Sequence, residues 1–394
     1  MIDTDVVAEK SRQATEVLRE QDVDAWLTFA RETTEIADPC LPYVLGFDVV
    51  WPTVVLFTRD GDSHVILGRH DAPNAERLGV HEVHAYDESL REPLLDVLDA
   101  TVPDEIAINY SKDVNTADGL THGLYRRLVD LLDGTGYADR LVSAESVVGQ
   151  LRGVKSPTER ERVVAAAERT EALFEALAEA WEPSWSERAV SDWLHARMRE
   201  EDLGSAWSWD YCPTVHHGGA SEVGHTLPGD LTLPEGEVLH LDFGVRQDDY
   251  AADVQRLYFR GDRSDVPEEL QSAFDDVRSA IETGKEALEP GVAGHEVDTA
   301  ARERFLDLGR PEFMHGFGHQ VGRQAHDGGT LLCPLWDRYG DAPRGTVRAG
   351  EIYTLELGVE TEWGYVGLEE MVEVTADGAE YLVEPQRQFR TLSG

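Results

Sequence analysis

The residues best able to do chemistry are two aspartates in HLDFGVRQDDYAADVQRLYF, residues 240–259. Asp242 and Asp253 flank the polar stretch 246–249, and the runs on either side have the β-branched and aromatic composition of strands. A hairpin that set the two aspartates opposite each other would hold their Cβ atoms about 4.5 to 5.5 Å apart. Carboxylates that close repel each other unless a cation lies between them. The segment is therefore compatible with a pair of metal ligands, but in so acidic a chain it is equally compatible with two ordinary surface acids.

The histidines concentrate after residue 210, among glycines and acids. In MHGFGHQVGRQAHDGG, residues 314–329, His315 and His319 have the four-residue spacing of zinc ligands on a helix, but HExxH is absent. Gly316 and Gly318 disfavour a helix and instead let a backbone approach a ligand or metal closely. Several histidines beside spaced acids favour a metal or proton-transfer site over a set of structural histidines.

A third segment, YTLELGVETEWGYVGLEEMVEV, covers residues 353–374 and carries glutamates inside apolar runs. Glu356 lies between two leucines, and Glu369 precedes a strand-like run. Alternate residues of a strand face opposite sides of the sheet, so each glutamate taken singly fits a solvent-facing position. Glu370 and Glu373 fit such positions equally well.

The composition narrows the class of protein. Asp and Glu number 77 against 35 Lys and Arg, and a formal net charge of -42 argues against nucleic acid or an anionic membrane as partner. With 394 residues and 41% hydrophobic composition, the chain can bury a large core and is expected to form two domains. The three cysteines are far apart and are expected to be reduced. No apolar run reaches membrane-spanning length, and we expect a cytoplasmic protein.

The balance of basic residues suggests a habitat. Lysine occurs at only four positions, Lys10, Lys112, Lys155 and Lys285, so most cations are arginines. A carboxylate-rich surface of this kind suits a salt-loaded cytoplasm, where high ionic strength screens the self-repulsion. The sequence is therefore consistent with a halophilic protein.

The pattern along the chain predicts an α/β domain that ends near residue 150. The runs DAWLTFA, TVVLFT, HVILG and EIAINY read as strands separated by polar or glycine-containing turns. A long helix then begins with a capping box, in which Ser156 caps, Pro157 takes the first helical position and Glu159 completes the box. Ser184 and Glu187 repeat that signal before a second helix.

The motifs taken together resemble one family. The ordered set LDFG, an Asp eleven residues on, HGFGH, GRQAHD, TLELG and GLEEMVEVT is similar to the pita-bread metallopeptidases, which include methionine aminopeptidase, prolidase, aminopeptidase P and the metal-free creatinases. YVLGF and VVLFTRDG are similar to the N-terminal domain of creatinase and prolidase. The resemblance implies an α+β protein, closest to the Xaa-Pro dipeptidase or aminopeptidase P-like members. Residues 1–150 would form an α/β creatinase-like domain and residues 151–394 a pita-bread catalytic domain.

The resemblance also implies a role for each matching residue. It gives five ligands for two divalent cations, which offset four carboxylates: Asp242, Asp253, His319, Glu356 and Glu369. Oxygen ligands with one imidazole suit Mn, Co, Fe or Zn, with Mn the first choice. A hydroxide bridging the metals would attack the substrate carbonyl. Glu356 would also shuttle the proton, and three histidines would line the pocket or hold the intermediate: His225, His315 and His326.

Two departures from the family pattern affect the expected substrate. Prolidases and aminopeptidases P usually carry Arg two positions before the last ligand, and this chain has Gly367 there. Many members have Glu-x-Pro where this chain has Asp327-Gly328-Gly329. Glycine cannot replace the bidentate recognition of a carboxylate by Arg. Arg323 and Arg344 are candidates to compensate.

Three hypotheses follow. The first is a metal-dependent peptidase that cleaves Xaa-Pro bonds of dipeptides or short peptides, and the filled ligand positions favour it. The second, kept open by Gly367, is a hydrolase or lyase of a small non-peptide amide or osmolyte, as in creatinase or ectoine hydrolase. The third is a metal-free binding protein, which the complete ligand set disfavours. The resemblance also implies a homodimer, since closed two-fold dimers are the commonest assembly.

Overall fold

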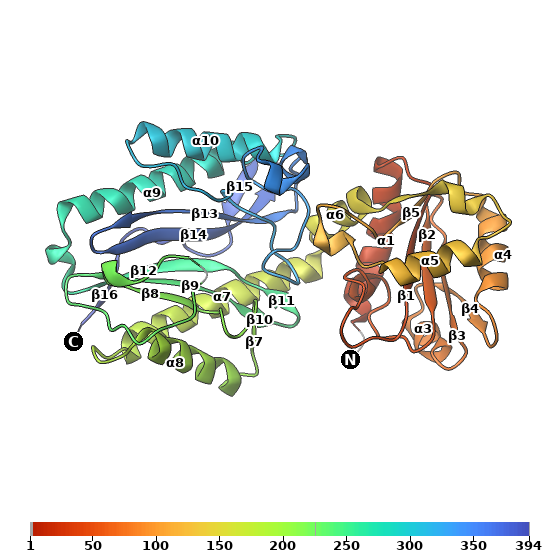
Figure 1. The fold of residues 1–394 in the computed structure, drawn as a ribbon, viewed down its shortest axis with the longest axis horizontal. Coiled ribbons are helices and arrows are strands. Elements are labelled where there is room, and N and C mark those ends of the chain that lie inside the picture. The colour runs from red at the N-terminus through yellow and green to blue at the C-terminus, as the bar shows by residue number, and fades with distance from the viewer. Residues whose placement is uncertain (1–2, 225, 394) are drawn as a thin grey trace. The chain divides into compact units, whose positions relative to one another are not determined.

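The computed structural model describes residues 3–224 and 226–393, and the chain divides into two compact units, Met1–Arg152 and Gly153–Gly394. Figure 1 shows the elements of each unit. Among the described residues, no helix has both the length and the apolar character that crossing a membrane requires.

The first unit is built on a six-stranded sheet in the order β4-β3-β2-β1-β5-β6. β2 runs antiparallel to both of its neighbours, and the other adjacent strands are parallel. The four segments predicted as strands are β1, β2, β3 and β5, whereas β4 is half polar and β6 is short, so neither was predicted. The strands are β1 (Ala25–Ala30), β2 (Thr53–Thr58), β3 (Ser63–Gly68), β4 (Glu82–Tyr86), β5 (Ile106–Ile108) and β6 (Leu141–Ser143).

Helices pack on both faces of this sheet, which makes the unit a three-layer α/β structure (Figure 1). On one face, Val7, Val17 and Leu18 of α1 pack with the side chains of β2 and β3 that point their way. On the other face, Leu94 and Leu98 of α4 pack on the alternate strand residues. The helices are α1 (Thr4–Glu20), α2 (Leu41–Val44), α3 (Ala72–Leu78), α4 (Arg91–Thr101), α5 (His122–Leu131) and α6 (Glu145–Gly153).

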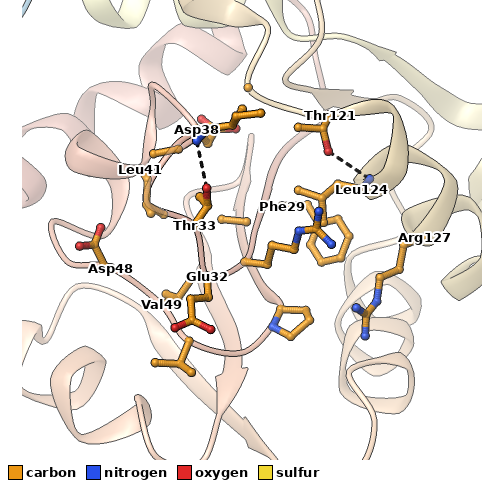
Figure 2. Close-up of a pocket in the computed structure, with 17 residues that line it drawn as sticks. Phe29, Glu32, Thr33, Asp38, Leu41, Asp48, Val49, Thr121, Leu124 and Arg127 are labelled. Carbon is orange, nitrogen blue, oxygen red and sulfur yellow. Dashed lines mark hydrogen bonds between the residues drawn. The ribbon is translucent and has the colours of Figure 1, made fainter.

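A cavity of about 340 Å³ opens in this unit at the carboxyl end of β1. Figure 2 shows its lining, in which Phe29 and Leu124 form an apolar side and Arg127, Glu32 and Asp48 carry charges. None of the residues predicted for the catalytic site lines it.

The second unit begins with two capped helices, α7 (Pro157–Ala180) and α8 (Glu187–Glu200). The predicted capping box of α7 is confirmed, because Ser156 accepts from the Glu159 amide and its own amide donates to the Glu159 carboxylate. The second cap was predicted at Ser184 and is instead Ser186, whose hydroxyl accepts from the Ala189 amide.

The largest sheet of this unit has the order β13-β14-β12-β9-β8, with β15 added to β14 and β16 to β12, and a small sheet has the order β11-β10-β7. The strands are β7 (Gly204–Ser205), β8 (Thr214–His217), β9 (Val238–Phe243), β10 (Val245–Gln247), β11 (Tyr250–Ala251), β12 (Val254–Arg260), β13 (Ile352–Thr361), β14 (Gly364–Thr375), β15 (Gly378–Tyr381) and β16 (Arg390–Leu392). Short 3-10 helices lie in both units, at Asn115–Ala117, Tyr137–Arg140, Gly218–Ala220, Arg263–Asp265, Asp337–Tyr339 and Ala342–Arg344.

Two pairs of helices enclose the sheets of this unit. Figure 1 shows α9 (Glu268–Ala287) and α10 (Gly294–Asp307) on the side of β13 and β14, and α7 and α8 on the opposite side. Phe274 and Val277 of α9 pack with Leu355 of β13 in one core, and Phe174 of α7 packs edge-on against Phe243 of β9 in the other. Because apolar side chains cover both sides, polar groups between the layers must find partners there.

Candidate metal centre

One row of registered residues crosses four adjacent strands of the large sheet. Glu356 of β13 pairs with Glu369 of β14, Glu369 pairs with Gln255 of β12, and Gln255 pairs with Asp242 of β9. Residues paired across strands project from the same face. The row therefore places three carboxylates and one amide side by side, although Asp242 and Glu356 at its two ends are 114 positions apart in the sequence.

Asp253 joins this row from the turn before β12. The predicted hairpin is present, with β9 antiparallel to β12 and β10 antiparallel to β11. Its turn residues, Asp248 and Asp249, adopt φ of 47° and 69°. However, the register pairs Asp242 with Gln255, so the expectation that Asp242 and Asp253 lie directly opposite is wrong. Asp253 precedes Gln255 by two residues, and its carboxylate still reaches the group formed with Asp242 and Glu369.

His319 reaches the same carboxylates from a loop that lies along β13. The Thr354 amide donates to the His319 carbonyl at 2.8 Å, and the His319 amide donates to the Thr354 hydroxyl at 3.2 Å. Any side chain on Gly318 would collide with the Thr354 carbonyl oxygen, so glycine is needed for this approach. The loop is not helical, as the glycines predicted.

The ligand atoms of the five predicted residues lie close together. His319 Nε2 is 3.8 Å from Asp253 Oδ2, 3.8 Å from Glu356 Oε1 and 3.7 Å from Glu369 Oε1. Asp242, Asp253 and Glu369 form a second group whose oxygens all lie within 4.8 Å of one another. His319, Glu356 and Glu369 form the first group. The two groups share Glu369, and together they contain all five residues.

The electrostatics of the cluster call for bound cations. Burial raises the pKa of all four carboxyl groups above their ordinary values, and repulsion from the neighbouring carboxylates adds to the shift for Asp253, Glu356 and Glu369. Burial also lowers the pKa of His319, which keeps its imidazole neutral and able to ligate. Asp242 Oδ1 is buried without a hydrogen-bond partner. The residues present therefore fit a pair of divalent cations, which would satisfy these oxygens and reverse the pKa shifts.

Gln255 is a functional residue that the sequence reasoning missed. Its Nε2 donates to Glu356 Oε2 at 3.1 Å and to Glu369 Oε2 at 3.2 Å, and its Oε1 contacts His240 Nε2 at 2.9 Å. Because carboxylates accept, Nε2 is the donor end of the amide, and Oε1 accepts from His240 Nε2–H. The available signal was its spacing, since a residue two positions after Asp253 on a strand shares its face.

The structure explains why glycine occupies position 367, on this same face of the sheet. A Cβ at position 367 would collide with the ring of Tyr365 and lie 2.9 Å from Gln255 Oε1 and 3.0 Å from His240 Nε2. Tyr365 also covers Gly358, the registered partner of Gly367, and packs edge-on to His240 at 4.9 Å. These side chains fill the space that an arginine at position 367 would need.

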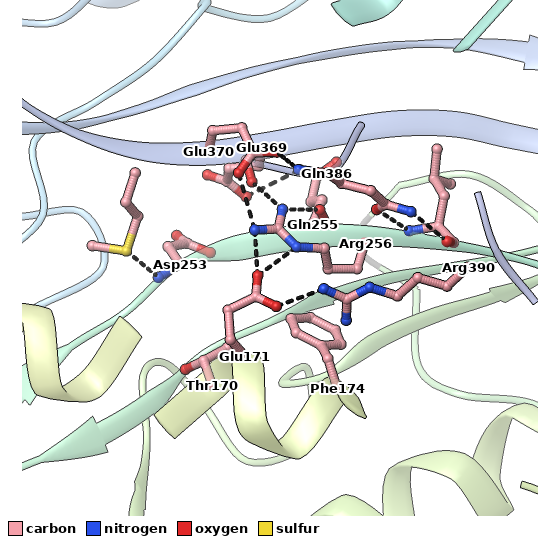
Figure 3. Close-up of polar contacts among 12 residues, drawn as sticks. Thr170, Glu171, Phe174, Asp253, Gln255, Arg256, Glu369, Glu370, Gln386 and Arg390 are labelled. Carbon is pink, nitrogen blue, oxygen red and sulfur yellow. Dashed lines mark hydrogen bonds and ion pairs between the residues drawn. The ribbon is translucent and has the colours of Figure 1, made fainter. Parts of the chain in front are cut away.

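Arg256 joins the strands behind the ligands, as Figure 3 shows. Its fully buried guanidinium pairs with Glu171 of α7 and with Glu370 of β14, the latter at 3.0 Å. Arg256 Nη1 also donates to the Glu369 carbonyl at 3.1 Å. Glu370 is 2% exposed, so the expectation that it could face solvent is wrong. Because Arg256 follows Gln255 and Glu370 follows Glu369, this ion pair locks the register of the row.

The three histidines and two arginines predicted for the substrate pocket differ in how they relate to the metal cluster. His326 is exposed, and its ring lies 4.1 Å from that of His319, next to the ligand cluster. His315 packs against Phe313, and no described contact joins it to the ligands. His225 lies outside the described residues. The two arginines considered as compensation have acidic partners of their own, Arg323 with Asp249 and Arg344 with Asp341.

Comparison with known proteins identifies the family. The profile of Metallopeptidase family M24 matches residues 161–376, which is more than half of the chain and includes the whole ligand row. The chain belongs to this family. The M24 resemblance inferred from the motifs is therefore confirmed.

Curated relatives of this M24 chain include peptidases of bacteria and archaea. The chain is 25% identical to an Xaa-Pro dipeptidase of Pyrococcus furiosus over 247 residues, 62% of this chain and 67% of that protein. It is 26% identical to the uncharacterized peptidase YqhT of Bacillus subtilis over 263 residues, 66% of this chain and 69% of that protein.

Solved structures extend the likeness to nearly the whole chain. An Xaa-Pro dipeptidase from Bacillus anthracis has a TM-score of 0.74 at 21% identity, covering 97% of this chain and 100% of that one. An X-Pro aminopeptidase from Thermotoga maritima has a TM-score of 0.70 at 23% identity, covering 97% and 99%. The predicted α+β class, with an N-terminal α/β domain before a pita-bread domain, is therefore confirmed.

The geometry predicts a supporting role for Gln255. Replacing Gln255 with Leu removes both donors and leaves the two glutamates free to rotate, so metal affinity should fall by about 10- to 100-fold. Competition with a chelator measures the affinity, and Gln388→Leu, at an exposed position, is the control. Wild-type metal affinity and turnover in Gln255→Leu would show that the amide does not support the ligands.

The buried ion pair predicts a large loss of stability. Arg256→Met leaves Glu370 buried without its cation, and the free energy of unfolding should fall by about 3 to 5 kcal/mol. Arg160→Met, which breaks the pair with Glu373 at a half-exposed arginine, should cost at most about 1 kcal/mol. Urea unfolding in concentrated KCl measures both. Equal losses in the two variants would contradict the role given to Arg256.

Proposed function

We propose that the protein is a metal-dependent peptidase that hydrolyses the Xaa-Pro bond of dipeptides or short peptides. The observation that carries the proposal is the row of Glu356, Glu369 and Asp242, completed by Asp253 and His319, inside an M24 fold. These five residues would hold two divalent cations. Mn is the first choice among Mn, Co, Fe and Zn, because the donor set is oxygen with one imidazole.

The chain's own side chains account for the proton chemistry. When bound, the cations would polarise the scissile carbonyl and lower the pKa of a water so that hydroxide is present at neutral pH. The Glu356 side chain is 22% exposed, whereas that of Glu369 is 2% exposed. Glu356 and Asp242 are the two partly exposed carboxylates of the cluster, and we assign to Glu356 the transfer of a proton to the leaving amine.

The histidines at the edge of the cluster complete the site. His326 is exposed beside His319, which suits a donor to the oxyanion of the tetrahedral intermediate. We retain His225 and His315 as substrate-contacting residues on the family resemblance alone. None of these three is needed to hold the cations.

Gly367 favours a second candidate function, hydrolysis or lysis of a small non-peptide amide or osmolyte. Tyr365, Gln255 and His240 fill the space over Gly367, and their side chains carry no guanidinium to bind a terminal carboxylate. A metal-free binding protein is disfavoured, because four buried carboxylates without cations would be held against their mutual repulsion.

The broader assignments belong to the same proposal. Residues 1–150 would be the creatinase-like domain and residues 151–394 the catalytic domain. We further propose a cytoplasmic, halophilic homodimer that acts on short peptides or small amides and binds neither nucleic acid nor membranes. The net charge of -42 supports the absence of nucleic-acid and membrane partners. The acidic surface and the scarcity of lysine support a halophilic protein.

A substrate comparison tests the function. The protein is stripped with a chelator in concentrated KCl and assayed on Leu-Pro, Leu-Ala and Leu-Pro-Ala, with and without Mn²⁺ or Co²⁺. We expect metal-restored cleavage of the proline substrates and none of Leu-Ala. Preference for Leu-Pro identifies a dipeptidase and preference for Leu-Pro-Ala an aminopeptidase. No peptide cleavage by protein that binds two metals would reject the peptidase in favour of the small-amide hydrolase.

A pair of variants separates metal binding from catalysis. His326→Ala should lower kcat by about 10²-fold, the loss typical of one oxyanion donor, and should leave two metals bound. Asp253→Asn should lose both activity and metal, because it removes a buried ligand. Metal analysis and kinetics on the same preparations measure this, and unchanged kinetics in His326→Ala would remove that residue from the site.

A further inference from the structure

Three potential ligands meet on the first unit's sheet, in a part of the sequence that precedes the M24 match. His64 of β3 is the registered partner of Glu82 on β4, and His84 follows Glu82 by two residues. All three side chains therefore project from one face, the face on which Ile66 packs with α4. Figure 1 shows β3 and β4 as neighbours at the edge of this sheet.

The donor atoms have the spacing of a metal coordination shell. His64 Nδ1 lies 3.2 Å from His84 Nε2 and 3.4 Å from Glu82 Oε2, and His84 Nε2 lies 3.8 Å from Glu82 Oε1. Ligand atoms about 2.0 to 2.2 Å from a tetrahedral zinc ion are roughly 3.3 to 3.6 Å apart. A shared proton between the two rings would explain the first distance alone, whereas one cation explains all three.

The surroundings suit a cation that keeps contact with solvent. The His64 side chain is 12% exposed and that of His84 is 25% exposed. The two residues lie on neighbouring parallel strands, which hold their backbones in place. Burial lowers the pKa of His64, which keeps its ring neutral and a lone pair available. Glu82 is 67% exposed and faces water, so the remaining coordination positions would be open to water.

The donor set selects the class of metal. Two imidazoles and one carboxylate suit Zn²⁺, Cu²⁺, Ni²⁺ or Fe²⁺, whereas Mg²⁺ and Ca²⁺ prefer shells made of oxygen. The abundant K⁺ of a salt-loaded cytoplasm is likewise an oxygen-seeking ion and is a poor competitor for imidazole nitrogen.

We propose that His64, Glu82 and His84 form an accessory site for one divalent transition-metal ion of the zinc class. The ion would join β4, the edge strand, to β3 and so stabilise the first unit, because a ligand that binds only the folded state favours folding. It would take no part in peptide hydrolysis, since none of its ligands belongs to the catalytic cluster.

Metal counting on the full chain tests this site. Chelator-stripped wild type and His84→Gln are dialysed against rising free Zn²⁺ in concentrated KCl, and bound zinc per chain is measured by mass spectrometry. The wild type should bind one zinc more than His84→Gln, while cleavage of Leu-Pro per milligram of Mn²⁺-loaded protein stays equal. The exposed His122, on α5 of the same unit, provides the control His122→Gln, which should bind zinc like the wild type.

The melting temperature of a variant that lacks a catalytic ligand is a second measurement, and it does not depend on zinc bound at the catalytic centre. Zn²⁺ should raise the melting temperature of Asp253→Asn and should raise it less in Asp253→Asn combined with His84→Gln or with Glu82→Gln. Equal zinc counts in wild type and His84→Gln, or equal thermal shifts in all these backgrounds, would overturn the proposal. The absence of Leu-Pro cleavage from Mn²⁺-loaded wild type, His84→Gln and His122→Gln alike would instead count against the proposed function and would leave the zinc count unaffected.

Discussion

The structure of the second unit depends on four carboxylates that share one buried patch. Two unit charges about 4 Å apart repel by about 4 kcal/mol at the effective dielectric of a protein. The oxygens of Asp242, Asp253 and Glu369 lie within 4.8 Å of one another, and those of Glu356 and Glu369 are equally close to His319. Several such repulsions approach the whole stability of a typical domain. A folded state with these residues ionised therefore depends on bound positive charge.

The rest of the unit holds these carboxylates together mainly by fixing the register of the strands that carry them. The register of β13, β14, β12 and β9 sets the row, and the Arg256–Glu370 pair behind it prevents β12 and β14 from slipping. A slip of one residue would turn every ligand to the opposite face. Gln255 then orients Glu356 and Glu369 from within the row.

Much of this site could be predicted from the sequence. The five residues proposed as ligands lie together in the structure, and the capping box of α7 and the strands β1, β2, β3 and β5 formed as expected. These features depend on local spacing and composition, which a single sequence displays. The motif order also carried the fold class, because the M24 match spans the motifs from LDFG to GLEEMVEVT.

The two failures have different physical origins, the length of a hairpin turn and a contact between distant segments. Asp253 was expected opposite Asp242, but the two-residue turn at Asp248 and Asp249 pairs Gln247 with Tyr250, and the same register continues along the hairpin to pair Asp242 with Gln255. Glu370 was expected at the surface but is buried, because Arg256 pairs with its carboxylate. For Glu370 the partner lies on a distant segment, where neither periodicity nor composition could indicate it.

The most direct test of the central claim is anomalous diffraction from crystals of the protein grown with Mn²⁺. The account predicts two anomalous peaks, each within bonding distance of carboxylate oxygens from the row of Asp242, Glu369 and Glu356, with His319 bound to one of them. Crystals with no anomalous peak among these residues at saturating Mn²⁺, and with the carboxylates paired by short oxygen–oxygen hydrogen bonds, would show that protons rather than metals neutralise the cluster and would contradict the account.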